Sequence, residues 1–202
     1  KRMGAHRVLG LDIPEVDVTE RRLEASEFMA TDFTRPLTLA NRFDLALSLE
    51  VGEHLPLPFA STFIKSVCAA SDLILFGAAI PYQGGMGHVN ENWLEFWQQL
   101  FHAEGYSAFD IVRPALWTDA SVTYYYKQNT ILYASGCPRQ TLLAAGLRPS
   151  EKIHSYIHPD MYIKAVNRSL PPKKRSLASD ILHYYYLANN KFDYSQEQTY
   201  GQ

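Results

Sequence analysis

Residues 43–56 read FDLALSLEVGEHLP, and residues 72–93 read DLILFGAAIPYQGGMGHVNENW. Each stretch opens as an apolar run that favours a strand and then passes into polar and glycine residues. Between them, residues 60–70 have the spacing of a helix. A strand, a helix and a second strand in this order predict a parallel pair with a crossover connection. The two stretches therefore predict an α/β fold.

The same alternation of short apolar runs and helical stretches extends on both sides of this segment. An amphipathic helix is expected over residues 92–104, and Gly105 ends it as a terminating glycine does. The strands are expected at residues 7–11, 27–31, 43–49, 72–80, 106–112 and 129–134. The alternating pattern predicts a doubly wound sheet with helices on its faces.

The length and composition of the chain indicate a globular protein. The chain has 202 residues, of which 47% are hydrophobic and 20% charged, which suits a globular domain and excludes a disordered one. Residues 1–136 carry 10 basic and 16 acidic side chains, whereas residues 137–202 carry 9 and 5. We therefore expect one domain over 1–136 and a C-terminal extension over 137–202, with an exposed basic linker at 171–175 and a last helix at 176–188.

Charge, hydropathy and cysteine content also restrict the kinds of partner and cellular location that we expect. The net charge of −2 and the acidic first part argue against a nucleic-acid partner, which needs phosphate-neutralising side chains. No apolar run is long enough for a membrane span, and two cysteines are too few for a disulfide framework. The chain opens with Lys1 and shows no export signal, so a cytoplasmic protein that lacks its N-terminus is expected.

Two acidic residues follow the first two expected strands. In doubly wound sheets, an acid after the second strand commonly accepts hydrogen bonds from ribose hydroxyls, and Asp12 has such a place. That rule puts a glycine-rich turn about 20 residues before the acid, so the turn would precede Lys1. Asp32 is suited to accept from an adenine amino group, and Phe33 can cover the ring. Ordinary turn-forming roles explain both acids nearly as well.

The most specific local signal is EVGEH at residues 50–54. If the chain turns helically there, Glu50, Glu53 and His54 converge on one point. His88 follows the next strand through a glycine-rich loop and reaches the same edge of the sheet. Two carboxylates and two imidazoles suit an octahedral Mg²⁺, Mn²⁺ or Fe²⁺ ion with two free positions. Helix capping and a metal-free general base at His54 or His88 are the alternatives.

These segments resemble class I S-adenosylmethionine-dependent methyltransferases of the bacterial methyltransferase-domain type. The resemblance rests on VLGLD at 8–12, ATDF at 30–33 and the two stretches quoted first. It implies a Rossmann-like, seven-stranded sheet whose last strand is antiparallel and whose first strand and glycine-rich loop are missing here. It also implies S-adenosyl-L-methionine as cofactor. The implied cofactor contacts are Asp12 at the ribose, with Ile13 next to it in the chain, Asp32 and Phe33 at the adenine, and Leu49 and Glu50 at the methionine end.

The E-x-x-E-H element with a later loop histidine is also similar to the metal site of ubiquinone-biosynthesis O-methyltransferases and of plant-type small-RNA 2′-O-methyltransferases. This similarity implies Glu50, Glu53, His54 and His88 as metal ligands, with His54 and His88 catalytic. The expected activity is metal-assisted O-methylation of a small-molecule acceptor. A non-catalytic methyltransferase-like binding module and a nicotinamide-dependent dehydrogenase remain alternatives.

Overall fold

The computed structural model describes residues 4–14 and 23–169. The chain divides into two compact units, residues 1–156 and residues 157–202. The composition boundary after residue 136 therefore falls inside the first unit. The linker expected at 171–175 and the helix expected at 176–188 lie outside the described residues.

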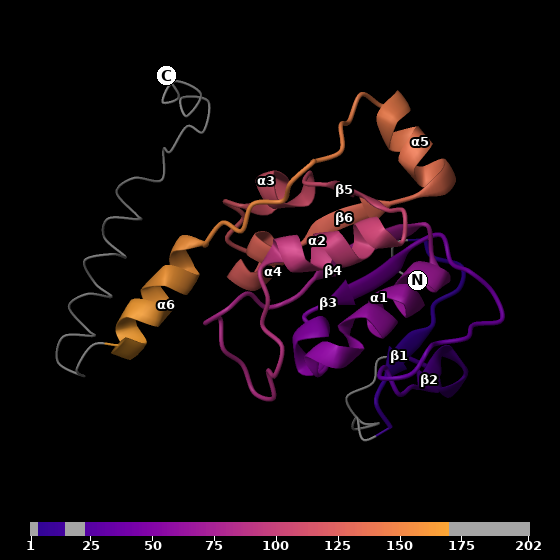
Figure 1. The fold of residues 1–202 in the computed structure, drawn as a ribbon, viewed down its shortest axis with the longest axis horizontal. Coiled ribbons are helices and arrows are strands. Elements are labelled where there is room, and N and C mark those ends of the chain that lie inside the picture. Colours follow the sequence, from indigo (N-terminus) through magenta and orange to yellow (C-terminus); the bar gives the residue numbers. More distant parts are fainter. Residues whose placement is uncertain (1–3, 15–22, 170–202) are drawn as a thin grey trace. The chain divides into compact units, whose positions relative to one another are not determined.

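The first unit is an α/β fold built on a mixed sheet, which confirms the expected α/β class (Figure 1). Its four-stranded sheet has the order β3-β4-β6-β5. β3 pairs with β4 in parallel, whereas β6 runs antiparallel between β4 and β5. The strands are β3 (Ala46–Leu49), β4 (Leu73–Gly77), β6 (Ile131–Ala134) and β5 (Ser107–Phe109). A separate parallel pair consists of β1 (Gly10–Asp12) and β2 (Phe28–Ala30).

Most expected elements occur, with shifted ends. Helix α1 (Ala60–Ala70) has the expected bounds, and α2 (Leu94–Ala103) lies within the expected helix. Asn129 does not begin the last strand, because it ends helix α4 (Tyr124–Asn129) and β6 starts only at Ile131. The run of tyrosines before Asn129 lacks the alternation of a strand, and the chain takes the helical alternative.

Three further helices, α3, α5 and α6, and three 3-10 turns of the described residues were not predicted from the sequence. Pro138 stands within the first turn of α5, where the missing amide hydrogen costs no helical hydrogen bond. In the second unit, His158 precedes α6, and its Nδ1 accepts a hydrogen bond from the Asp160 amide (3.2 Å). The bounds of these six elements are α3 (Val112–Leu116), α5 (Gly136–Ala144), α6 (Pro159–Ser169) and the 3-10 turns η2 (Ala25–Glu27), η3 (Gly52–His54) and η4 (Leu57–Phe59).

An aromatic cluster joins α2 to the sheet. The ring of Phe101 stacks on Tyr133 of β6 with a centroid separation of 3.9 Å, and Phe76 of β4 meets both rings edge-on. Trp97, one turn earlier on α2, also contacts Phe76 and is fully buried. This packing holds α2 against β4 and β6, and it thereby anchors the loop that leads from β4 into α2.

One face of β3 stays open. Ser48 is buried, whereas Leu45 and Leu47 have relative exposures of 46% and 64%. Alternate residues of a strand point to opposite faces, so the two leucines share the face away from Ser48. In a strand with one buried and one exposed face, the exposed residues are normally polar. Here they are two leucines, so the exposed face is apolar.

We predict that Phe101→Ala lowers the free energy of unfolding by about 3–5 kcal/mol, because it removes a fully buried ring from the cluster. Urea denaturation followed by circular dichroism measures the change. Tyr82→Ala is the matched control, since that ring is 84% exposed, and it should shift stability by less than about 0.5 kcal/mol. Equal effects of the two substitutions would contradict the assigned core.

Candidate functional site

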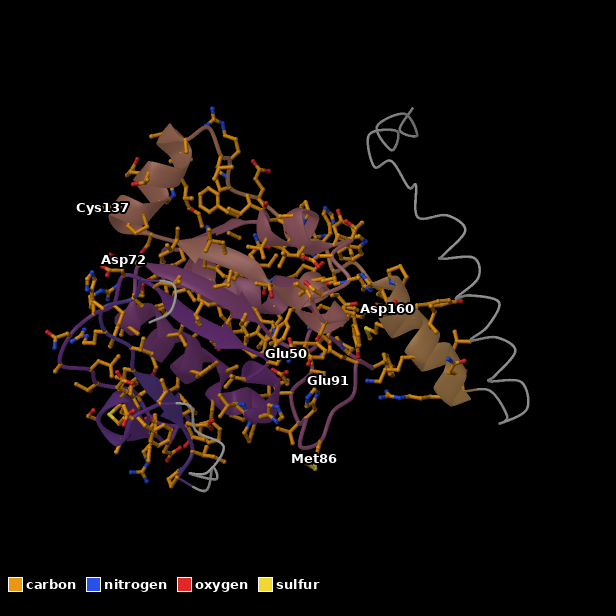
Figure 2. The ribbon with its side chains drawn as sticks, turned by 180° about the vertical axis from the view of Figure 1, so that it is seen from behind. Glu50, Asp72, Met86, Glu91, Cys137 and Asp160 are labelled. Atoms are coloured by element: carbon orange, nitrogen blue, oxygen red, sulfur yellow. The ribbon has the colours of Figure 1, made fainter. Side chains whose placement is uncertain are left out.

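The parallel pairing of β3 with β4 brings two polar segments to one edge of the sheet. Leu49 is opposite Gly77, and the amide of Glu50 donates to the carbonyl oxygen of Gly77 (2.8 Å). Both strands therefore release their following loops at this carboxyl edge, as the sequence predicted. β6 runs the other way, so Asn129, just before it, reaches the same edge. Figure 2 shows Glu50 and Glu91 near each other here and Asp72 at the opposite end.

Glu50 is held in an unusual backbone conformation. Its φ is +57°, in the left-handed region that costs a non-glycine residue on the order of 1 kcal/mol. Its carboxylate oxygens accept hydrogen bonds from the side-chain amides of Gln83 (2.6 Å) and Asn129 (3.0 Å). Such outliers persist where surrounding contacts hold them, and they concentrate at functional sites. The two amides supply those contacts.

A carboxamide network surrounds these two donors. Asn129 also donates to the Gln83 side-chain oxygen (2.9 Å), and Gln128 donates to the Asn129 side-chain oxygen (3.0 Å). All three side chains are buried. The roles of Gln83 and Asn129 as partners of Glu50 were missed in the sequence, because they depend on the antiparallel entry of β6 beside β4. The only signal in the sequence was the pair of adjacent polar residues, Gln128 and Asn129, just before the apolar strand β6.

Glu53 is fully buried, yet neither of its carboxylate oxygens has a hydrogen-bond partner among the residues that the structure describes. It lies in the 3-10 turn η3 rather than on an α-helix. Its backbone carbonyl accepts from the amides of Val89 (2.9 Å) and Asn90 (3.0 Å), which ties this turn to the loop after β4. A buried carboxylate without a partner is costly and calls for a compensating ligand.

The two predicted histidines lie beside this carboxylate. The rings of His54 and His88 meet edge-on with centroids 4.8 Å apart, and His88 Nε2 is 3.9 Å from Glu53 Oε1. One ligand atom from each of Glu53, His54 and His88 lies within 4.8 Å of the others. The structure thus brings together three of the four predicted metal ligands. The fourth, Glu50, directs its oxygens to Gln83 and Asn129.

These three side chains fit a divalent cation. Ligand atoms about 2.1 Å from an octahedral ion lie roughly 3–4 Å apart, so small side-chain rotations would bring the three atoms onto one ion. An ion there would satisfy the unpartnered oxygens of Glu53 and reduce its repulsion with Glu50. Carboxylate and imidazole ligands suit Mn²⁺, Fe²⁺ or Zn²⁺. With three protein ligands, such an ion would keep positions for substrate oxygens.

The two carboxyl groups have raised pKa values. Burial, and next the charge of Glu50, raise the pKa of Glu53 to about 7. Burial also raises the pKa of Glu50, against the lowering effect of hydrogen bonds from Asn129 and Gln83. Near neutral pH the pair therefore resists carrying two negative charges without a cation.

The predicted cofactor residues lie at the carboxyl ends of β1 and β2. Asp12 is exposed and ends β1, and its Oδ1 accepts from the amide of the exposed Ile13 (2.8 Å). Asp32 accepts from the amide and hydroxyl of Thr34, which is the principal cause of its lowered pKa. Phe33 packs edge-on against Phe63 of α1.

Leu49, the remaining predicted cofactor contact, ends β3 and is half-buried. It precedes Glu50, so both residues predicted at the methionine end lie at the carboxyl edge. The structure therefore places all the predicted cofactor residues at or just after strand ends, those of the β1–β2 pair in one sheet and Leu49 at the end of a strand of the other.

A comparison with protein-family models, curated proteins and solved structures found no match for the chain. Among the helices of residues 4–14 and 23–169, none is long and apolar enough to cross a membrane.

We predict that Glu53→Gln stabilises the metal-free protein at pH 8 by on the order of 1–3 kcal/mol. The folded protein holds the Glu53 proton up to about pH 7, whereas the unfolded chain loses it near the ordinary glutamate pKa of 4.5. The contribution of this proton to stability is therefore complete below about pH 4.5 and is lost as the pH rises through 7. Urea denaturation in EDTA, from pH 4.5 to 8, measures it.

In that experiment the curves of wild type and Glu53→Gln should diverge as the pH rises. Glu104→Gln, at an exposed position after α2, removes the same charge and should follow the wild type. Parallel pH profiles for wild type and Glu53→Gln would show that Glu53 carries no burial penalty.

Proposed function

We propose that this chain carries most of the catalytic domain of a class I S-adenosylmethionine-dependent methyltransferase. Its reaction is the transfer of a methyl group to a hydroxyl group of a small molecule, assisted by a divalent cation. The observation that carries this proposal is the order of the strands.

Doubly wound sheets have the spatial order 3-2-1-4-5-6. If β1 and β2 correspond to the second and third strands, and β3 and β4 to the fourth and fifth, the observed pairs β2-β1 and β3-β4 match this order with one strand left out. The omitted strand is the first, between β1 and β3, where the resemblance to methyltransferases expects one. The antiparallel β6 is the last strand of the described residues, which also agrees with that resemblance.

The open face of β3 supports the same interpretation. Leu45 and Leu47 are exposed on the strand that would become central once the first strand pairs with it. In a doubly wound fold, both faces of a central strand are covered by helices. A strand and a helix supplied before β1 would cover the two leucines.

The cofactor would lie at the carboxyl edge of the sheet. Asp12 would accept hydrogen bonds from its ribose hydroxyls, and Asp32 with Phe33 would face its adenine. S-adenosylmethionine supplies an electrophilic methyl group when it is bound. Leu49 ends β3, the strand next to the missing one, and Glu50 follows it; both would border the methionine end.

Glu53, His54 and His88 would hold the cation, which supplies Lewis acidity that lowers the pKa of an acceptor hydroxyl. Gln83 and Asn129 keep the Glu50 carboxylate fixed beside them. In the metal-free alternative, His54, the more exposed of the two imidazoles, would instead accept the hydroxyl proton. Holding the hydroxyl and the methyl group in line is the main contribution of such a site.

The carboxylate and two imidazoles favour this reaction over the alternative of a nicotinamide-dependent dehydrogenase. Asp12 serves a dinucleotide ribose equally well. Hydride transfer, however, gives no role to a buried carboxylate beside two histidines that has no hydrogen-bond partner within residues 4–14 and 23–169. The acidic first part of the chain favours a small acceptor over a polynucleotide.

We predict that Mn²⁺ raises the melting temperature of the protein and that EDTA reverses the rise. By binding linkage, an ion at 100 times its dissociation constant adds about 2.7 kcal/mol. Glu53→Ala, His54→Ala and His88→Ala should each abolish most of the gain, whereas His102→Ala, at an exposed position on α2, should retain it. Differential scanning fluorimetry with and without Mn²⁺ measures the shift, and an equal shift in all variants would remove the ion from this site.

We also predict that Asp12→Ala weakens binding of S-adenosylhomocysteine by roughly 10- to 150-fold, or about 1.5–3 kcal/mol, the cost of losing hydrogen bonds to a charged group. Calorimetry on the longest reading frame that contains residues 1–202 measures it. Asp44→Ala is the control, because Asp44 is exposed and precedes β3 at the opposite edge. Absence of binding by the wild type would contradict the methyltransferase proposal.

A further inference from the structure

The loop between β4 and α2 is organised around one carboxylate, that of Glu91. We infer that Glu91 is a positioning residue that fixes the tautomer and the orientation of His88, and that it thereby sets the affinity of the cation site. The effect on the cation rests on the proposed function, whereas the effect on His88 does not.

Glu91 gathers three donors from the loop. Its Oε2 accepts from the amide of Tyr82 (2.9 Å), and its Oε1 accepts from the amide of Gly84 (2.8 Å) and from His88 Nδ1 (2.9 Å). The Glu91 side chain is 19% exposed and that of His88 12%. The carboxylate is therefore shielded enough for these hydrogen bonds to be strong.

The contact with Glu91 determines which nitrogen of His88 carries the proton. An ionised carboxylate only accepts hydrogen bonds, so Nδ1 must donate. In a neutral imidazole the other nitrogen, Nε2, then presents a lone pair. His88 Nε2 is the atom that faces Glu53 Oε1 at 3.9 Å. Glu91 thus directs the one free lone pair of His88 into the candidate cation site.

Burial alone does not hold this loop in place. Tyr82 and Met86 are 84% and 96% exposed, and Figure 2 shows Met86 at the tip of the loop. Tyr82 has a φ of +69°, which is strained for a residue with a side chain. The hydrogen bonds from Tyr82 and Gly84 to Glu91 offset this strain and close the loop over His88.

Gly85 fits the same arrangement. A Cβ atom at this residue would lie 2.2 Å from His88 Nε2, so only glycine leaves room for the ring in its present orientation. The Gly85 backbone therefore approaches the imidazole near Nε2, whereas Glu91 binds it at Nδ1. Together they leave His88 one orientation.

Carboxylates that hold a ligating histidine by its second nitrogen typically change metal affinity 10- to 100-fold when they are replaced. Glu91→Gln keeps the size of the side chain but cannot reproduce its contacts. Whichever way the carboxamide faces, its NH₂ group meets at least one of the donors now bound to the carboxylate. We therefore expect the loop to lose a hydrogen bond and His88 to lose its single tautomer.

The experiment measures the tautomer and the affinity separately, at pH 8. Nitrogen-15 NMR of histidine-labelled, metal-free protein reports which nitrogen of His88 carries the proton, with His88→Ala used to assign the signal. Titration with Mn²⁺ alone, followed by electron paramagnetic resonance of the free ion, gives the dissociation constant. Glu104→Gln is the control of equal charge, and the melting temperature of each variant reports folding.

We expect His88 to be the Nδ1–H tautomer in the wild type and in Glu104→Gln, and a mixture of tautomers in Glu91→Gln. Mn²⁺ affinity should fall about 10- to 100-fold in Glu91→Gln alone, with a nearly unchanged melting temperature. An Nε2–H tautomer in the wild type, or a wild-type tautomer in Glu91→Gln, overturns the inference. If the wild type binds no Mn²⁺, the metal part of the proposed function fails, and the tautomer alone decides the role of Glu91.

Discussion

The parallel pairing of β3 with β4 is the constraint on which the candidate site depends. The register that sets Leu49 opposite Gly77 makes both strands end at the same level. The turn with Glu53 and His54 and the loop with His88 therefore start side by side, although 33 residues lie between His54 and His88 in the sequence. A parallel pair needs a crossover, and α1 provides it. The aromatic cluster on α2 then secures the far end of the loop.

This edge of the sheet concentrates polar groups that a purely structural site would avoid. Glu50 has a left-handed backbone, and its carboxylate is held by two buried amides. Glu53 is fully buried without a hydrogen-bond partner among the described residues. Both features cost stability in the free protein. A bound cation would offset the cost at Glu53, which is the usual exchange between stability and function at binding sites.

The loop that carries His88 illustrates how hydrogen bonds can replace burial. Its exposed side chains contribute little packing, so its shape rests on the Glu91 carboxylate and on the carbonyl oxygen of Glu53. The Glu53 carbonyl binds the loop backbone while its carboxylate faces His88. One residue thus couples the position of the loop to the geometry of the ligands.

The sequence by itself determined the α/β class and the course of α1, because periodicity and strand ends are local properties. It also predicted that Glu50, Glu53, His54 and His88 converge, and the structure groups the last three of these. It also indicated acids after β1 and β2. Only the tertiary structure decided that Asn129 ends a helix, that β6 enters antiparallel beside β4, and that Gln83 and Asn129 bind Glu50. It also decided the three contacts of Glu91. These features arise from pairings between distant segments, which no local pattern encodes.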